Sequence, residues 1–406
     1  MKLKSLLFGS AAVLAAGTGA LAADLPTVEP VEYVRICDAF GAKFYYIPGT
    51  DTCLRVGGYV RVQSGGVWGS NASLTARYGV PPAEVNNYTT QARGHIDLDA
   101  RTQTDFGLVR AYIGLEMTVG GRNTTPPFSG VNSYGTAPNL AAAFIQVSND
   151  WGTYTAGHTG SFFDFYGGVG WGFRLGEEAG TGEATLFAWT LAGGNGFSLT
   201  VSAEDPDSIG RRRDGDDDYE GLEYPDGVAN IRIDQGWGSA QIMGVVGQIH
   251  DVNGDGLGWA AGGGLSLNLP GGWTIAGQGG YSEGRVAYIS SDIGGFGDFD
   301  GPTGQQTNTS WAARAGISGP LFAPNLTGWV GGSYVRVEEN GNNDRYDFWA
   351  VVGGAKYEPV PDLYMGPEVA YNSYDFTNVN GNGLNPNDVR ADYDLWSIMW
   401  RVQRSF

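Results

Sequence analysis

The chain has 406 residues and a net charge of −19, with 67 glycines, 12 tryptophans, 21 tyrosines and 18 phenylalanines. The acidic balance argues against nucleic acid as a partner, because neutralising phosphates needs clustered Lys and Arg side chains. Glycine is unfavourable in helices and aromatic residues suit pleated surfaces, so the composition predicts an all-β protein.

Residues 1–22 are predicted to be a cleaved signal peptide. Two lysines give a basic n-region, residues 6–16 give an apolar h-region, and Ala20-Leu21-Ala22 gives a small-residue cleavage motif. A membrane anchor is the alternative, but the apolar run is short for a spanning helix and no stop-transfer pattern follows. Cleavage leaves 22 basic against 43 acidic residues, a net charge of −21. Residues 23–406 then form the mature domain of an exported protein.

Two cysteines, Cys37 and Cys53, lie sixteen positions apart near the mature N-terminus. An even pair in an exported chain predicts a disulfide, whose loop would stabilise the fold by about 3 kcal/mol. Metal binding is the weaker alternative, because no histidine or further cysteine lies nearby.

The mature chain has no uninterrupted apolar stretch of about 20 residues, so no transmembrane helix is available. It does contain sixteen segments with strand character, several of which alternate apolar and polar residues, as Val60 and Val62 do with Tyr59 and Arg61. The predicted strands are residues 55–68, 93–101, 109–116, 141–147, 153–158, 184–191, 197–203, 228–233, 239–249, 257–269, 273–289, 310–318, 326–338, 346–358, 363–376 and 391–406.

The apolar face of such strands is the inside of a soluble sandwich but the outside of a pore, and the alternation alone leaves both open. The connections favour the pore, because seven short turns alternate with eight longer loops. This predicts a transmembrane antiparallel β-barrel with both termini on the periplasmic side. A barrel of about 16 strands is wide enough to hold water.

The mature chain resembles the alphaproteobacterial porin family of rhizobial and related bacteria. The residues that carry the resemblance are 37–41 (CDAFG), 46–50 (YIPGT), 52–61 (TCLRVGGYVR), 92–94 (ARG), 99–104 (DARTQT), 161–165 (SFFDF) and the terminal Phe406. The resemblance implies a homotrimer of sixteen-stranded barrels in the cell outer membrane, each a passive diffusion pore. It also implies that the third long loop, residues 159–183, folds inward as a constriction.

The last strand departs from the family pattern at one position. Its apolar residues Trp396, Ile398, Trp400 and Val402 are in phase with Phe406, but Arg404 interrupts the series. The series resembles the assembly signal of outer-membrane barrels, so we expect weaker recognition by the insertion machinery.

Selectivity in a pore comes from charged side chains at its narrowest point. We expect carboxylates of the third long loop to face arginines of the wall and to set a transverse field; the alternative is that these charges only solvate loop and wall. The candidate carboxylates are Asp164, Glu177, Glu178 and Glu183, and the candidate arginines are Arg61, Arg93, Arg101, Arg110, Arg314 and Arg336. The negative total suggests a mild cation preference.

Two loop segments have weaker functional interpretations. Residues 251–256 (DVNGDG) match the opening of a calcium loop, but Gly262 stands where the bidentate Glu is expected, which favours a plain hairpin loop. Arg211, Arg212 and Arg213, followed by four aspartates, are solvated surface in the simplest interpretation, and a contact to lipopolysaccharide through divalent cations is the alternative.

Enzyme chemistry is not expected. His95, Asp97 and Asp99 share one strand face, but lumen lining explains them better than acid–base catalysis. The sequence has no nucleophile elbow, phosphate loop or paired-histidine metal motif, so we expect no catalytic residue, cofactor or metal.

The leading hypothesis is therefore an outer-membrane porin for ions and small hydrophilic solutes. A substrate-specific channel for sugars or oligosaccharides is the alternative. It would need an aromatic track, and the tyrosines expected to face the lumen, Tyr59, Tyr112 and Tyr334, are scattered. A barrel enzyme or adhesin would need a catalytic cluster or a passenger region, and neither is visible.

Overall fold

The computed structural model describes residues 35–70, 87–120, 138–173, 175–177, 180–206, 223–251, 254–290, 298–300, 306–340, 344–377 and 392–406. The predicted signal peptide, Glu178 and the Arg211–Arg213 cluster lie outside these residues, as does part of the 251–256 segment. Within the described ranges, no helix has both the length and the apolar character to cross a bilayer.

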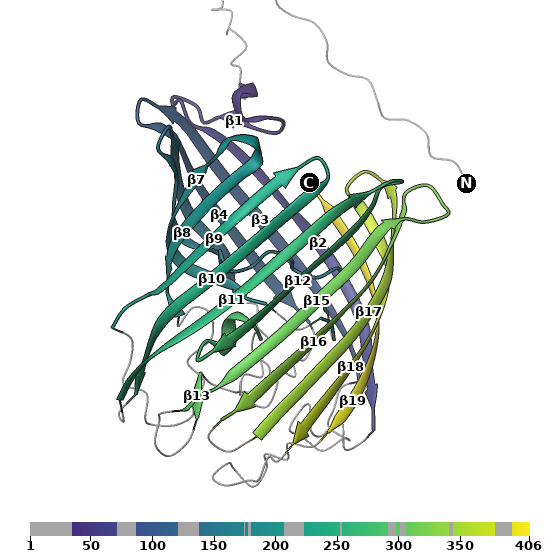
Figure 1. The fold of residues 1–406 in the computed structure, drawn as a ribbon. Coiled ribbons are helices and arrows are strands. Elements are labelled where there is room, and N and C mark those ends of the chain that lie inside the picture. The colour runs from purple at the N-terminus through teal and green to yellow at the C-terminus, as the bar shows by residue number, and fades with distance from the viewer. Residues whose placement is uncertain are drawn as a thin grey trace, which may run out of the picture.

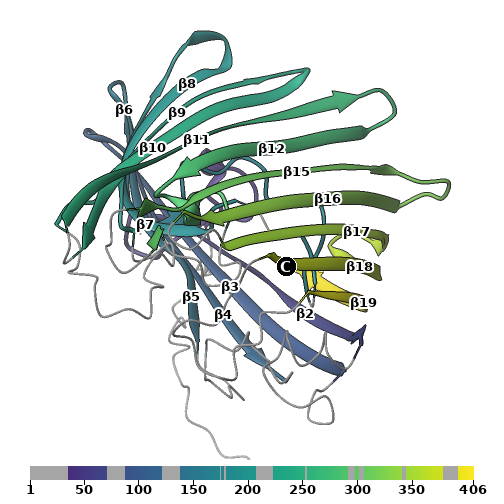
Figure 2. The same cartoon turned by 60° about the horizontal axis from the view of Figure 1, so that its bottom comes forward.

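Sixteen antiparallel strands form a closed barrel (Figures 1 and 2). They are β2 (Cys53–Gly69), β3 (Tyr88–Thr104), β4 (Gly107–Val119), β5 (Asn139–Asn149), β6 (Gly152–Gly160), β7 (Glu183–Ala192), β8 (Phe197–Glu204), β9 (Asp226–Gln235), β10 (Gly238–Asp251), β11 (Gly254–Leu269), β12 (Trp273–Glu283), β15 (Thr309–Pro320), β16 (Leu326–Glu339), β17 (Asp344–Val360), β18 (Leu363–Thr377) and β19 (Tyr393–Ser405). Each pairs with the next along the chain, and β19 closes the barrel on β2, with Trp396 opposite Trp68. The predicted fold and strand number are confirmed.

One predicted strand is too long. The segment 273–289 stays in the barrel only as far as Glu283. Gly284 then adopts a φ of +65°, where an added Cβ would lie 2.6 Å from Ile249 Cδ1. A 3₁₀ helix, η5 (Val286–Tyr288), follows, with Val286 and Tyr288 buried. The strand ends here because the positive φ of Gly284 turns the chain away from the wall. Val286 and Tyr288 are then buried inside the barrel instead of continuing the strand. A two-stranded sheet, β13 (Phe299–Asp300) with β14 (Gln306–Thr307), precedes β15.

The two faces of the wall differ in chemistry. On β15, Trp311 is exposed while Arg314 is buried, and on β19 Trp396, Ile398 and Trp400 are exposed while Arg401 is buried. Exposed apolar side chains outside and polar ones inside are the arrangement of a barrel that faces lipid outside and water inside. We call the strand positions whose side chains face outward the outer phase, and those whose side chains face into the barrel the inner phase.

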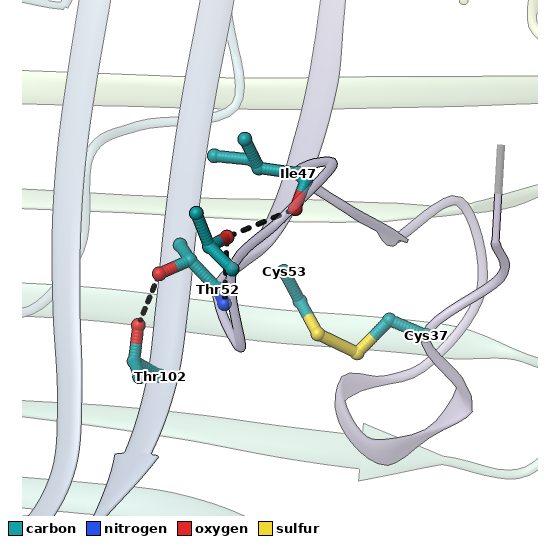
Figure 3. Close-up of a disulfide and its surroundings, with 6 residues drawn as sticks. Cys37, Ile47, Thr52, Cys53 and Thr102 are labelled. Carbon is teal, nitrogen blue, oxygen red and sulfur yellow. Dashed lines mark hydrogen bonds between the residues drawn. A yellow bond between two sulfur atoms is a disulfide. The ribbon is translucent and has the colours of Figure 1, made fainter. Parts of the chain in front are cut away.

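The N-terminal residues 35–52 form a small unit at the barrel end that carries the short turns and the C-terminus (Figure 1). It contains η1 (Asp38–Phe40) and β1 (Tyr45–Tyr46), and β1 pairs with the start of β2. The predicted disulfide is present: Cys37 and Cys53 are bonded, with a Cα–Cα distance of 6.0 Å (Figure 3). Because short turns lie on the periplasmic rim of such barrels, this unit marks the periplasmic end.

Candidate functional site

The connection between β6 and β7 lies against the inner phase of the wall. We call its described residues, 161–173, 175–177 and 180–182, the inner segment. Its two ends meet where the Ser161 amide donates to the Gly182 carbonyl at 3.2 Å. Glu204 of β8 accepts from the Ser161 hydroxyl at 2.7 Å, and Asn230 of β9 donates to the Phe162 carbonyl at 2.7 Å. The segment therefore starts by crossing the neighbouring strands.

Its middle part contacts strands farther round the barrel. The side-chain oxygen of Gln278 on β12 accepts from the amides of Phe165 and Tyr166, both at 2.8 Å. Gly264 on β11 has no side chain where the Phe165 ring lies, since an added Cβ would sit 2.2 Å from the ring. The close approach of Phe165 to the wall thus depends on glycine at position 264.

The far part of the inner segment is held by two charged side chains of the last strands. The Glu368 carboxylate of β18 accepts from the amides of Trp171 and Gly172. Arg401 of β19 donates to the Trp171 carbonyl at 3.2 Å and lies 4.8 Å from the centre of the indole. Both are buried. The inner segment is thus attached to inner-phase residues from β8 round to β19.

Asp164 forms an ion pair with Arg314 of β15, whose Nη2 lies 2.7 Å from the carboxylate. Burial raises the pKa of the Asp164 carboxyl, and the Arg314 guanidinium opposes this rise. Two candidates that the sequence separates by 150 positions are brought together here. The charge of the carboxylate is balanced by the wall directly beneath it.

The other candidate carboxylates do not line up with Asp164. Glu177 accepts from the amides of Val169 at 2.9 Å and Gly170 at 3.2 Å, so it stabilises a turn within the inner segment. Glu183 lies on the outer phase of β7, in step with the exposed Phe187. The expectation that Glu183 faces the lumen is therefore corrected. Side chains of β7 alternate between the two faces, and Glu183 occupies one of the outward-facing positions. Glu178 lies outside the described residues.

Four candidate arginines lie on the inner phase of β2, β3 and β4. Arg61 donates to Gln403 at 2.7 Å, and Arg93 forms an ion pair with Glu116 at 2.9 Å. Arg101 and Arg110 both bind Asp99, nearer the periplasmic end. The side chains of Arg93, Arg101 and Arg110 keep 25–29% of their surface exposed, against 7% for Arg314. Water thus reaches this part of the wall.

Arg336 lies on the outer phase, which corrects its assignment to the lumen. It pairs across strands with Trp311, an exposed outer-phase residue, and its Nε donates to Asp347 at 2.6 Å. Tyr334, which was expected to face the lumen, lies on this face too and accepts from Arg336. Strand β16 alternates strictly, but its inner phase is apolar here. The rule that polar side chains face the lumen therefore assigns Arg336 and Tyr334 to the wrong face.

Glu368, Arg401, Gln278 and Gln241 hold the inner segment, the last by donating its side-chain amide to the Asp164 carbonyl at 3.1 Å. The sequence interpretation missed all four. Arg401 alternates with Trp400 and Val402, so its inward direction could be read from the pattern. Nothing local in the sequence reveals that its partner is a loop 230 positions away.

His95, Asp97 and Tyr112 form a row of hydrogen-bonded side chains on the inner wall, which we call the polar ladder, rather than a catalytic group. The His95 ring stacks on Tyr59 with centroids 4.9 Å apart, and its Nε2 lies 2.8 Å from Asp97. Among the described residues, no group of three or more His, Cys, Asp or Glu side chains is placed to hold a metal.

Residues 24–397 match the family model described as "Porin subfamily". Porin Omp2b of Brucella neotomae is 30% identical over 422 residues, covering all of both chains, and Porin Omp2b of Brucella suis is 31% identical over 435 residues with the same coverage. Solved structures of outer-membrane channels share the fold. The outer-membrane channel DcaP of Acinetobacter baumannii has a TM-score of 0.69 at 15% identity, covering 89% of this chain and 99% of that one. An anion-selective porin of Comamonas acidovorans has a TM-score of 0.54 at 13% identity, covering 87% and 100%.

Proposed function

Because the chain belongs to the porin subfamily, we propose that its constriction lies between the inner segment and the arginine-bearing wall of β2–β4. The protein is an outer-membrane porin, a passive diffusion pore for ions and small hydrophilic solutes, and not an enzyme. The proposal concerns the residues that border its water-filled path.

The observation that carries the proposal is a difference in exposure between arginines of the same inner phase. Arg314 and Arg401 are buried beneath the inner segment, whereas Arg93, Arg101 and Arg110 stay partly exposed. A segment that covers one side of the wall leaves the path for solutes along the other. The proposed constriction therefore comprises Arg61 and Arg93 on the wall and Asp164 of the inner segment, which is paired with the buried Arg314.

The charges of this constriction favour weak selectivity. Asp164 is paired with Arg314, whereas Glu177 is held by neutral amides of its own segment, which do not cancel its negative charge. On the facing wall, Arg93 is paired with Glu116, while Arg61 donates to the neutral Gln403. The three arginines Arg61, Arg93 and Arg314 thus balance the three carboxylates Asp164, Glu177 and Glu116, and the mild cation preference suggested by the net charge is not supported.

The alternative of a sugar-specific channel is not favoured by the described wall. Tyr59 stacks on His95 and Tyr112 on Phe144, so these rings are engaged with neighbours, and Tyr334 lies on the outer phase. A continuous aromatic track for sugar rings is absent from the described inner phase.

Liposome swelling with sugars of increasing size, combined with single-channel conductance, tests the proposal. Entry that falls smoothly with solute size and shows no saturation supports a general pore. Saturable entry of one sugar, with block of ion current by that sugar, would overturn it in favour of the specific channel.

The porin is further proposed to act as a homotrimer. One structural neighbour, OmpT of Vibrio cholerae, is described as a trimer form, with a TM-score of 0.53 at 12% identity over 87% of this chain and all of that one. The outer phase of β19 and β2 offers a broad apolar surface, with Trp396, Ile398 and Val60 about half exposed. Native mass spectrometry in detergent checks this: a threefold mass supports the trimer and a single-chain mass contradicts it.

Lipopolysaccharide is proposed to contact the outer-phase charges near the long loops. Arg336 and Arg345 flank Asp347, with their Nε atoms 2.6 and 2.8 Å from it, beside the exposed Trp311. Guanidinium groups next to an aromatic ring suit a phosphorylated lipid at a bilayer surface. Co-purification of lipopolysaccharide that decreases in an Arg345→Gln variant supports the contact, and unchanged co-purification contradicts it.

A further inference from the structure

A cluster of three arginines around one aspartate lies at the periplasmic end of the pore, and we infer that it is a binding site for small oxyanions such as inorganic phosphate. The residues are Arg55, Asp99, Arg101 and Arg110, all on the inner phase of β2–β4. The inference rests on the proposed pore, because the cluster lies on the inner phase at the periplasmic end of that pore.

Two of the arginines saturate Asp99. Arg101 donates from Nε at 3.1 Å and from Nη2 at 2.8 Å, and Arg110 donates from Nε at 2.9 Å and from Nη2 at 3.1 Å. The Asp99 side chain is completely buried beneath these two guanidinium groups. One carboxylate thus accepts four charge-assisted hydrogen bonds, and its negative charge is already matched by the first arginine.

Arg55 is the surplus cation. Its Nη2 lies 3.6 Å from Asp99, beyond hydrogen-bond distance, and 37% of the side chain is exposed. Its Nε is buried and has no hydrogen-bond partner among the described residues. The cluster therefore has three positive charges for one negative charge, with donors left over on Arg55 and Arg101. Guanidinium edges with free donors match the oxygens of a phosphate or carboxylate group.

Asp97, two residues before Asp99 on the same strand face, is bound by other side chains. Asp97 accepts from the Tyr112 hydroxyl and lies 2.8 Å from His95 Nε2. These two contacts engage the Asp97 carboxylate, and the ion pair of Arg55 is with Asp99. The partly exposed Arg55 side chain lies on the inner phase, so its charge faces the lumen.

The N-terminal unit fixes the two exposed arginines. The ring of Phe44 lies 4.9 Å from the Arg101 guanidinium and 5.6 Å from that of Arg55, and Phe44 itself is buried. Stacking on the planar faces leaves the donor edges free for an anion. The Cys37–Cys53 disulfide ties this unit to the base of β2, two residues before Arg55, and the Thr52 hydroxyl bonds that of Thr102 on β3 at 2.9 Å (Figure 3). The unit thus orients a recognition surface.

Arg232 lies at the same end of the barrel but, unlike Arg55, its charge is fully paired. It lies on the inner phase of β9, stacks on Phe165 at 5.1 Å, and donates to Asp234 twice at 2.8 Å. One arginine is matched by one aspartate there, so no charge is left over. Arg232 is therefore a matched control for Arg55.

The test measures the effect of inorganic phosphate on single-channel current at constant ionic strength and pH. Phosphate is expected to reduce current through the wild type in a saturable manner. Arg55→Gln should raise the half-effect concentration about tenfold, because one charge-assisted contact is lost. Arg232→Gln should leave it unchanged. Phe44→Ala, which keeps every charge, should raise it by a smaller factor. Heat-modifiable mobility on gels checks that each variant is folded.

Three results would overturn the inference: no saturable phosphate effect on the wild type, equal shifts in Arg55→Gln and Arg232→Gln, or no shift in Arg55→Gln. A conducting wild type in any of these cases leaves the proposed pore intact. A folded wild type without conductance would instead overturn the pore and this site with it.

Discussion

The two halves of the inner wall differ although they share one alternating pattern. On β2–β4 the inner phase carries arginines, carboxylates and His95, linked in a ladder and reached by water. On β16–β18 the same phase carries Val335, Val337 and Phe348, which are fully buried. The first half faces the solute path, and the second is covered by other parts of the chain.

The difference shows what decides whether an inner-phase residue is polar or apolar. It is apolar where other parts of the chain pack over the wall, and polar where water reaches the wall. Phe162 and Val169 of the inner segment pack against the apolar cluster, and Phe163 meets Tyr288 of η5 edge to face at 5.2 Å. This half is a small hydrophobic core built inside a barrel. The open half is stabilised by paired charges and hydrogen bonds instead.

The largest expected effect comes from truncating the covered core. Phe348→Ala should lower the free energy of unfolding by about 3–5 kcal/mol, because the ring is fully buried against Tyr374, with centroids 5.0 Å apart. Phe144→Ala on β5, where the ring stacks on Tyr112 of the open half, should cost clearly less, since that ring is only partly buried. Urea unfolding in detergent measures both, and equal losses would contradict the division into two halves.

Loss of the Glu368 contacts should follow in size. Glu368→Ala leaves the amides of Trp171 and Gly172 without their acceptor, at a cost of about 1–3 kcal/mol each. The inner segment should detach, and single-channel conductance should rise. Glu116→Ala, which removes a carboxylate from the open wall, is the control and should change selectivity more than conductance. Unaltered conductance in Glu368→Ala would show that the segment is held elsewhere.

A smaller effect is expected where the inner segment touches glycine. Gly264→Ala should displace Phe165, since the new Cβ would lie 2.2 Å from its ring, and should cost about 1–3 kcal/mol. Pushed off the wall, the ring should narrow the path and lower conductance. At Gly114 on the open wall the nearest atom lies at 3.5 Å, so Gly114→Ala should have no such effect. Equal conductance of the two variants would argue against this contact.

Acidification should change selectivity through Asp164. Burial raises the pKa of this carboxyl, so it takes up a proton at a higher pH than an ordinary aspartate does. Protonation removes a negative charge and leaves the Arg314 charge unpaired, so the chloride-to-potassium permeability ratio should rise as pH falls through this pKa. Asp164→Asn should show the raised ratio already at neutral pH and lack this step. Reversal potentials across a pH series measure it, and an identical step in the variant would contradict the assignment.

The smallest effect is expected on the outer phase. Arg336→Gln should change the free energy of unfolding by only about 0.2–1 kcal/mol, because the ion pair with Asp347 is partly exposed. Ion selectivity should not change, since the side chain does not face the lumen. A shifted reversal potential would place Arg336 on the solute path after all.

The open half could be predicted from sequence and the covered half could not. Arg61, Arg93, Arg101 and Arg110 alternate with apolar residues, so their inward direction follows from the period of a strand. At Arg336 the same rule failed, because Val335 and Val337 face inward under cover and reverse the polarity of the pattern. The strand count and the disulfide depend on local signals and spacing. The contacts of Asp164 with Arg314, and of Trp171 with Glu368, depend on how a loop crosses the barrel, which no local signal encodes.

The open path for solutes is proposed to run along β2–β4 and not along β15–β18. Cysteine accessibility tests this directly, using Gly114→Cys on the open wall and Ala312→Cys beneath the inner segment, both on the inner phase. A charged thiol reagent added to single conducting channels should reduce current rapidly in Gly114→Cys and slowly or not at all in Ala312→Cys. Faster block in Ala312→Cys, or equal rates in the two variants, would contradict the account.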